Sequence, residues 1–347
     1  MIDPDYSLEK RFEEENVADE ICIGPRGEAW SRVCNHPRGQ RLGFDLCPAR
    51  KYTSDVVSAE IRGASGIGVD YLQYFDQNQG CTSPMCYSKR HGHPDTPGSW
   101  QTRAMQKLLD NAQQAAGKTL IGCENAAAQP YVKVCKLNDL RNHLAWSTGG
   151  IPVALYSYLY HEYTSGFSGN GVWLHGAIDL EATPFFCVWN LAWNFVSGNL
   201  LSVVLKDKGD IHWNWCQLWK DPAPEQEPII TLIGNLSKWR RTEMKKYLVA
   251  GRMVKCPEVI SPAVIIYTTS QTPPQVPSVL ASAYSDDNGG KAIVLANSNR
   301  IATECTIVFD TETVVEILCS DAEPVSAEGK RIKVTVPALD AALVKVK

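Results

Sequence analysis

Apolar segments of strand length alternate with helix-forming segments through the first half of the chain, and this alternation limits the possible folds. One predicted helix has Pro97 in its first turn, and Ala104, Leu108 and Ala112 share one of its faces. The predicted strands are 67–77, 120–125 and 151–163, and the predicted helices between them are 97–119 and 137–146. Because parallel strands need such helical crossovers, the sequence predicts an α/β fold with buried parallel strands.

The pattern changes near residue 275, where short apolar segments follow one another with turn signals between them. The clearest turn is DDNGG at 286–290, which is typical of a hairpin. We therefore expect two domains: an α/β domain over 1–255 and a small antiparallel β-sandwich over 275–347. Charged residues of the second domain are expected in turns or on its outer face, without a catalytic role.

Each of the three predicted strands ends in polar residues. In parallel sheets and barrels, catalytic residues lie at the carboxyl ends of the strands. The polar residues here are Asp76, Gln77 and Asn78, then Glu124 and Asn125, then His161 and Glu162. Two carboxyl groups about 5 to 10 Å apart are the catalytic pair of glycosidases. Asp76 and Glu124 are therefore candidate catalytic residues, and the neighbouring polar residues are candidates for substrate binding. The structural alternative is an Asp76 that caps a helix or pairs with an arginine, and a buried His161 that binds a backbone carbonyl.

The loop after the first strand is rich in Cys, His, Gly and Pro. Cys81, Cys86, His91 and His93 include the usual ligand types of zinc, but their spacing is not that of a standard zinc finger. We therefore favour an ordered substrate-binding loop, without a metal or other cofactor, over a zinc site. The twelve cysteines are scattered, which predicts mostly buried free thiols, and a Cys81–Cys86 disulfide would require an oxidising compartment.

Composition excludes several classes of function. A net charge of −4 gives no basic surface for nucleic acid, and no run of about 18 apolar residues exists to span a membrane. The acidic start lacks the apolar core of a signal peptide, so at face value the chain is cytoplasmic. Ten Trp and thirteen Tyr are many for this length. Most are expected to pack in the core, while Tyr74, Trp100 and Trp213 are candidates for stacking on sugar rings.

Four segments in order, VDYLQYFDQNQG, CYSKRHGHPDTPGSW, CENAAAQPY and VALYSYLYHEY, resemble a bacterial domain-of-unknown-function family. That family consists of glycoside-hydrolase-like TIM barrels with a C-terminal β-sandwich and is distantly similar to the endo-α-N-acetylgalactosaminidases. The resemblance covers roughly residues 45 to 345. It implies that Asp76 is the nucleophile and Glu124 the acid/base. It also implies substrate contacts for His91, His93 and His161, and a secreted or periplasmic location if the natural N-terminus lies upstream.

In this resemblance Asp76 would end the fourth barrel strand, yet only 75 residues precede it. A complete barrel takes about 250 residues for eight units. The expected fold is therefore a partial (β/α)8 TIM-type barrel followed by the sandwich, with QRLGFDL (40–46) pairing beside the first predicted strand. Such an open edge could cause self-association. The expected function is hydrolysis of a complex glycan. The alternatives are a non-catalytic glycan-binding or truncated structural remnant, and a metal-dependent hydrolase that uses the Cys/His loop.

Overall fold

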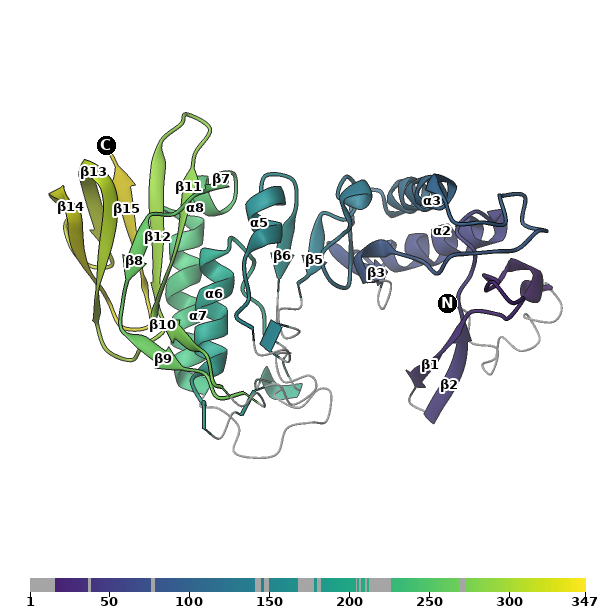
Figure 1. The fold of residues 1–347 in the computed structure, drawn as a ribbon, viewed down its shortest axis with the longest axis horizontal. Coiled ribbons are helices and arrows are strands. Elements are labelled where there is room, and N and C mark those ends of the chain that lie inside the picture. The colour runs from purple at the N-terminus through teal and green to yellow at the C-terminus, as the bar shows by residue number, and fades with distance from the viewer. Residues whose placement is uncertain are drawn as a thin grey trace. The chain divides into compact units, whose positions relative to one another are not determined.

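The computed structural model divides into two compact units, Met1–Asn138 and Asp139–Lys347 (Figure 1). The structure describes residues 16–36, 39–75, 79–140, 145–146, 150–167, 178–179, 182–203, 205, 207–209, 211, 226–268 and 272–347. The expected division into a catalytic part over 1–255 and a sandwich over 275–347 stays a prediction, because it concerns function rather than compactness. Among the described residues, no helix is both long and apolar enough to cross a bilayer.

The first unit contains two long helices, a short parallel sheet and a separate hairpin. Its elements are η1 (Val17–Glu20), β1 (Ser31–His36), β2 (Gly39–Phe44), α2 (Lys51–Ser65), β3 (Tyr71–Phe75), η2 (Gln79–Cys81), α3 (Ser99–Ala116), β4 (Leu120–Cys123) and η3 (Gln129–Tyr131). The strand β5 (Leu137–Asp139) lies at the boundary. Helices α2 and α3 pack side by side (Figure 1). Strands β3 and β4 are parallel, which confirms the strand–helix–strand crossover predicted from the sequence.

The segment 40–46 does not pair beside β3. Its strand β2 forms an antiparallel hairpin with β1, in a sheet of their own. The predicted pairing is therefore wrong. The reason is that the hairpin partner is the preceding segment of the chain, so a local contact satisfies the β2 backbone without a long-range pairing.

The second unit combines helices with one large antiparallel sheet and a separate two-stranded sheet of β9 and β10. Its elements before the sheet are α5 (Leu155–Tyr160), β6 (Ser165–Phe167), α6 (Phe186–Val196), η5 (Asp207–Gly209), α7 (Gln226–Arg241) and α8 (Lys245–Leu248). The later strands are β7 (Arg252–Val254), β8 (Glu258–Ile260), β9 (Ala263–Ile265), β10 (Gln275–Pro277), β11 (Val279–Ser285), β12 (Lys291–Asn297), β13 (Thr303–Cys319), β14 (Val325–Val336) and β15 (Ala341–Val346). Seven strands form the large sheet in the order β14-β13-β15-β12-β11-β7, with β8 on β13. The predicted C-terminal antiparallel structure is confirmed, and it begins earlier, at β7.

The segment 151–163, predicted as a strand, contains the helix α5. Within α5 Ser157 is buried, and His161 is buried directly after the helix, while Leu155, Tyr158 and Leu159 are exposed. The two buried residues are four apart, the spacing of one face of a helix, and the apolar residues do not show this spacing.

The large sheet is buried on both faces. In β12, Ala292, Val294 and Ala296 pack toward α6 and α7, and Ile293 and Leu295 point to a second core. Strand β13 changes register between Val308 and Thr313, and its two halves pair with β8 and with β15. Because both halves of β13 contribute to the second core, the sheet curls over itself and encloses that core.

The contribution of the core to stability can be measured on helix α7, because this helix has one buried and one exposed aliphatic side chain. Leu232 is fully buried, whereas Ile230 on the same helix is 61% exposed. We expect Leu232→Ala to lower the free energy of unfolding by about 2–5 kcal/mol. Ile230→Ala should change it by less than about 0.5 kcal/mol. Urea unfolding followed by tryptophan fluorescence measures both, and equal effects would contradict the assignment of this core.

Candidate active site and Cys/His cluster

The parallel strands β3 and β4 end side by side. Phe75 is the register partner of Cys123, and the Glu124 N–H donates to the Phe75 carbonyl oxygen at 3.1 Å. The predicted adjacency of the two strands is therefore confirmed. The candidate nucleophile Asp76, with Gln77 and Asn78, lies outside the described residues, as does Trp213. The separation of the two candidate carboxyl groups thus stays a prediction.

Glu124 is buried at the end of β4, where the chain after β3 returns to meet it. The Gly80 N–H donates to the Glu124 carbonyl oxygen at 2.9 Å, and the Gly80 carbonyl accepts from Ala128 at 3.0 Å. Gly80 has φ of +66°, and a Cβ there would lie 2.7 Å from the Ala126 carbonyl oxygen. Only glycine fits this close approach of two loops. Asn125 also takes a positive φ, of 62°, so the turn after Glu124 is tightly defined.

Two of the aromatic candidates have partners of their own. The Tyr74 hydroxyl donates to the Glu60 carboxylate, and burial followed by this hydrogen bond raises the pKa of Tyr74. The Trp100 ring stacks on His93 with 3.8 Å between ring centroids and 10° between planes. Its Nε1–H donates to the Thr96 carbonyl at 2.8 Å. One face of Trp100 is therefore already covered by an imidazole, and its stacking on a sugar stays a prediction.

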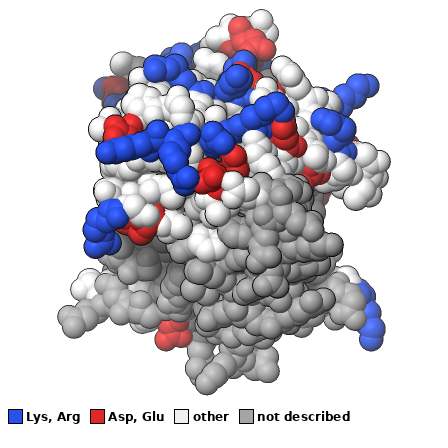
Figure 2. Space-filling model, turned by 90° about the vertical axis from the view of Figure 1, so that its right-hand side faces the viewer, with Lys and Arg blue, Asp and Glu red and all other residues white. Residues whose placement is uncertain are grey.

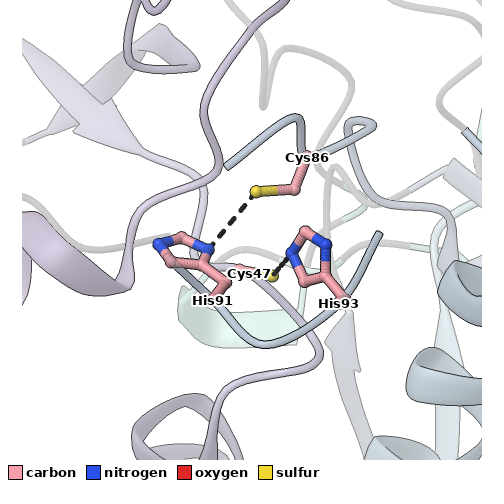
Figure 3. Close-up of side chains that lie close together, drawn as sticks. All are labelled: Cys47, Cys86, His91 and His93. Atoms are coloured by element: carbon pink, nitrogen blue, oxygen red, sulfur yellow. Dashed lines mark hydrogen bonds between the residues drawn. The ribbon is translucent and has the colours of Figure 1, made fainter. Parts of the chain in front are cut away.

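The Cys/His loop between β3 and α3 closes on a cysteine from a different part of the chain (Figure 3). Ligand atoms of Cys47, Cys86, His91 and His93 all lie within 4.8 Å of one another. The Cys86 Sγ is 3.4 Å from His91 Nδ1, and the Cys47 Sγ is 3.4 Å from His93 Nε2. The grouping suggested by the sequence was wrong in one member: Cys47 takes the place of Cys81.

A further cysteine adjoins this cluster. Cys22 shares a small buried cluster with Cys47 and Cys86, and Trp100 packs against it. Hydrogen bonds with Cys47 and Cys86, together with burial, raise the pKa of Cys22, which keeps it a thiol. The same contacts, from Cys22 and then Cys47, lower the pKa of Cys86, and the Ile23 N–H also points at its sulfur at 3.4 Å. Sequence reasoning missed Cys22 and Cys47, since no local spacing links them to the loop.

Cys81 belongs to a second buried cluster with Cys123 and Cys135. The Cys81 and Cys135 sulfur atoms are 2.9 Å apart. Hydrogen bonds from Cys135 and Cys81 lower the pKa of Cys123 to about 5. Cys81 and Cys86 are both free thiols in different clusters, so the disulfide considered between them does not form in this structure. The expectation of mostly buried free cysteines is confirmed for the described residues.

His161 and Glu162 lie in the second unit, at the end of α5. His161 is buried, with Nδ1 2.8 Å from the Gly251 carbonyl oxygen and Nε2 3.1 Å from that of Leu248. A Cβ at Gly198 would lie 2.2 Å from His161 Nε2, so the ring is closely packed. These contacts match the structural alternative considered for His161. The exposed Glu162 forms an ion pair with Arg252 at 3.6 Å.

Charged side chains on the face drawn in Figure 2 are mixed in sign. Lys and Arg gather on its upper part, with Asp and Glu among them. Several exposed pairs in the first unit are in contact, including Lys51 with Asp55 and Lys133 with Asp110. The absence of a nucleic-acid partner stays a prediction, as does the glycan partner.

Comparison with solved structures shows the fold. An α-amylase from Geobacillus thermoleovorans, solved with acarbose, matches 97% of this chain and 73% of its own, at 9% identity and a TM-score of 0.51. An α-amylase from H. orenii matches 97% and 76%, at 11% identity and 0.51. A putative α-N-acetylgalactosaminidase from Bacillus halodurans matches 95% and 68%, at 12% identity and 0.43. No family model and no curated protein matches the sequence. The chain therefore has a fold similar to that of the two α-amylases.

The contacts of His161 predict a measurable pH dependence of stability. Burial is the largest cause of its lowered pKa, against the opposing effect of the two carbonyl contacts. An unfolded histidine binds a proton near pH 6.5, whereas folded His161 stays neutral until lower pH. The unfolded state therefore binds more protons below about pH 6.5, and stability falls as the pH decreases through that value.

We expect His161→Gln to remove part of this loss. The measurement is the urea midpoint at about pH 7.5 and about pH 5.5, on either side of the ordinary histidine pKa, for both proteins. The wild-type difference should exceed that of the variant. Equal differences would show that folding does not lower the pKa of His161.

Proposed function

We propose that this chain is a glycosidase-like protein that acts on a complex glycan with Asp76 and Glu124 as its carboxyl pair. The observation that carries the proposal is the parallel register of β3 and β4, which pairs Phe75 with Cys123 directly before these two residues. The glycoside-hydrolase-like fold supports it, as do the sequence segments that resemble barrels with a strand-end carboxylate. Residues 1–255 would then form the catalytic part of an incomplete barrel.

The chemistry assigns a different role to each carboxyl group. Glu124 protonates the oxygen of the leaving group, and Asp76 attacks the anomeric carbon or activates a water molecule. A separation of about 5–5.5 Å corresponds to retention of configuration, and about 6.5–9.5 Å to inversion. Adjacent parallel strands lie about 4.8 Å apart, so residues that follow paired strand ends are within reach of either geometry. Tyr74 and Trp100 would contact the glycan.

A second function is favoured by the small size of the parallel sheet. In the part of the chain that the structure describes, β4 is the only strand that pairs with β3. An incomplete barrel of this kind could bind glycan without cleaving it. It would also leave a strand edge through which the chain could self-associate.

The test is hydrolysis of a panel of glycans by the full chain, with Asp76→Asn, Glu124→Gln and the wild type compared. We expect each substitution to reduce kcat/KM by at least about 100-fold, since each removes a group that acts on the reacting bond. The matched control is Asp110→Asn, which removes the same charge from an exposed ion pair in the same unit. It should leave hydrolysis unchanged.

Three outcomes separate the proposals. Hydrolysis that is lost in both site variants supports the glycosidase. Glycan binding without hydrolysis, in wild type and variants alike, supports the binding protein. Hydrolysis that survives in both variants would show that other residues catalyse it and would overturn the assignment of Asp76 and Glu124.

A further inference from the structure

We propose that Cys47, Cys86, His91 and His93 bind a zinc ion that holds the loop between β3 and α3 in place. Thiolate and imidazole are the ligands that zinc prefers, and a structural site uses four of them. The proposal is independent of glycan chemistry, because it rests on a different set of side chains from the candidate carboxyl pair.

The distances within the cluster fit a tetrahedral ion. With Zn–S of about 2.3 Å and Zn–N of about 2.1 Å, a sulfur and a nitrogen of one tetrahedron lie about 3.6 Å apart. The two observed sulfur–nitrogen distances are both 3.4 Å. All four ligand atoms lie within 4.8 Å of one another, so they can converge on one point with small movements (Figure 3).

The orientation of His93 is that of a metal ligand. Its Nδ1 lies 2.8 Å from the Pro94 carbonyl oxygen, which accepts a hydrogen bond from the ring N–H. The lone pair is then on Nε2, the atom that faces Cys47. The stacked Trp100 ring fixes the plane of the imidazole. A ligating histidine typically donates its other N–H to a carbonyl in this way.

The surroundings favour a closed structural site over a catalytic one. Cys47, Cys86 and His91 are buried, and His93 is covered on one face by Trp100. The Ile23 N–H points at the Cys86 sulfur at 3.4 Å, and such a donor stabilises a metal-bound thiolate without binding the ion. Cys22 packs in one buried cluster with Cys47 and Cys86, and its own thiol donates to the Pro84 carbonyl oxygen at 3.8 Å. We therefore place Cys22 beside the site as a positioning residue.

The loop between η2 and α3 has little regular structure or core of its own to hold it in place. Between η2 and α3 it contains no helix or strand, and the buried apolar cluster beneath it consists of Cys22, Cys47 and Cys86, with Trp100 packed against them. So small a core contributes little to stability, and small regions of this kind commonly depend on metals. The ion would join Cys47, in the segment before α2, to the loop between η2 and α3.

The experiment measures metal in the full chain, purified under reducing conditions without chelator. We expect about one zinc ion per chain by elemental analysis, because one tetrahedral site is proposed. Cobalt substitution should give the absorption bands of a tetrahedral site with two thiolate ligands. Cys47→Ser, Cys86→Ser and His93→Gln should each lose the ion on dialysis, and Cys22→Ser should weaken binding by about 10- to 100-fold.

The controls distinguish this site from the rest of the chain. Cys81→Ser alters the second cysteine cluster, and Cys256→Ser alters a cysteine of the second unit. Both should keep the metal. Wild type treated with a chelator should become sensitive to protease within residues 82–98 and regain protection when zinc is restored, a readout that does not depend on how well the variants fold.

Three results would overturn the proposal. The first is wild-type protein that holds no zinc and takes none up from solution. The second is loss of the ion in Cys81→Ser with retention in Cys47→Ser, which would move the site to the second cluster. The third is a disulfide between two of Cys22, Cys47 and Cys86, found by mass spectrometry of the non-reduced protein as purified, which would exclude the four-ligand site.

Discussion

The parallel pairing of β3 with β4 is the constraint on which the candidate active site depends. The pairing shifts by one residue between Gln73, the partner of Gly122, and Phe75, the partner of Cys123. Because side chains on a strand have a period of two, a one-residue shift changes the face on which later side chains point, so this irregularity sets how β3 enters the site. In the loop after β3, Gly80 has no side chain, so its backbone can approach that of Ala126 in the loop after β4.

The order of the irregular loop after β3 comes from the side-chain contacts that it makes. It brings Cys86, His91 and His93 to Cys47, and it brings Cys81 separately to the end of β4. The two cysteines of one short segment therefore belong to two different buried clusters. A loop without regular secondary structure gains its order from such side-chain contacts, and those of Cys81 lie at the end of β4, at Cys123.

The second unit is stable for a different reason. Its sheet is covered on one face by α6 and α7 and encloses a second core on the other. His161, Tyr284 and Arg240 complete this packing with hydrogen bonds to backbone carbonyls. Buried polar groups with partners of this kind stabilise the packing of the second unit.

The sequence by itself determined the elements whose pattern is local: the helix α3, the strands β3 and β4 on either side of it, and the antiparallel strands after residue 275. Periodicity failed for α5, whose buried residues are Ser157 and His161 rather than its apolar ones. Tertiary structure alone decided that Cys22 and Cys47 lie beside Cys86, and that Cys81 belongs to a different cluster. The physical reason is that sequence spacing restricts which ligands of one segment can meet, whereas contacts between segments depend on the path of the whole chain.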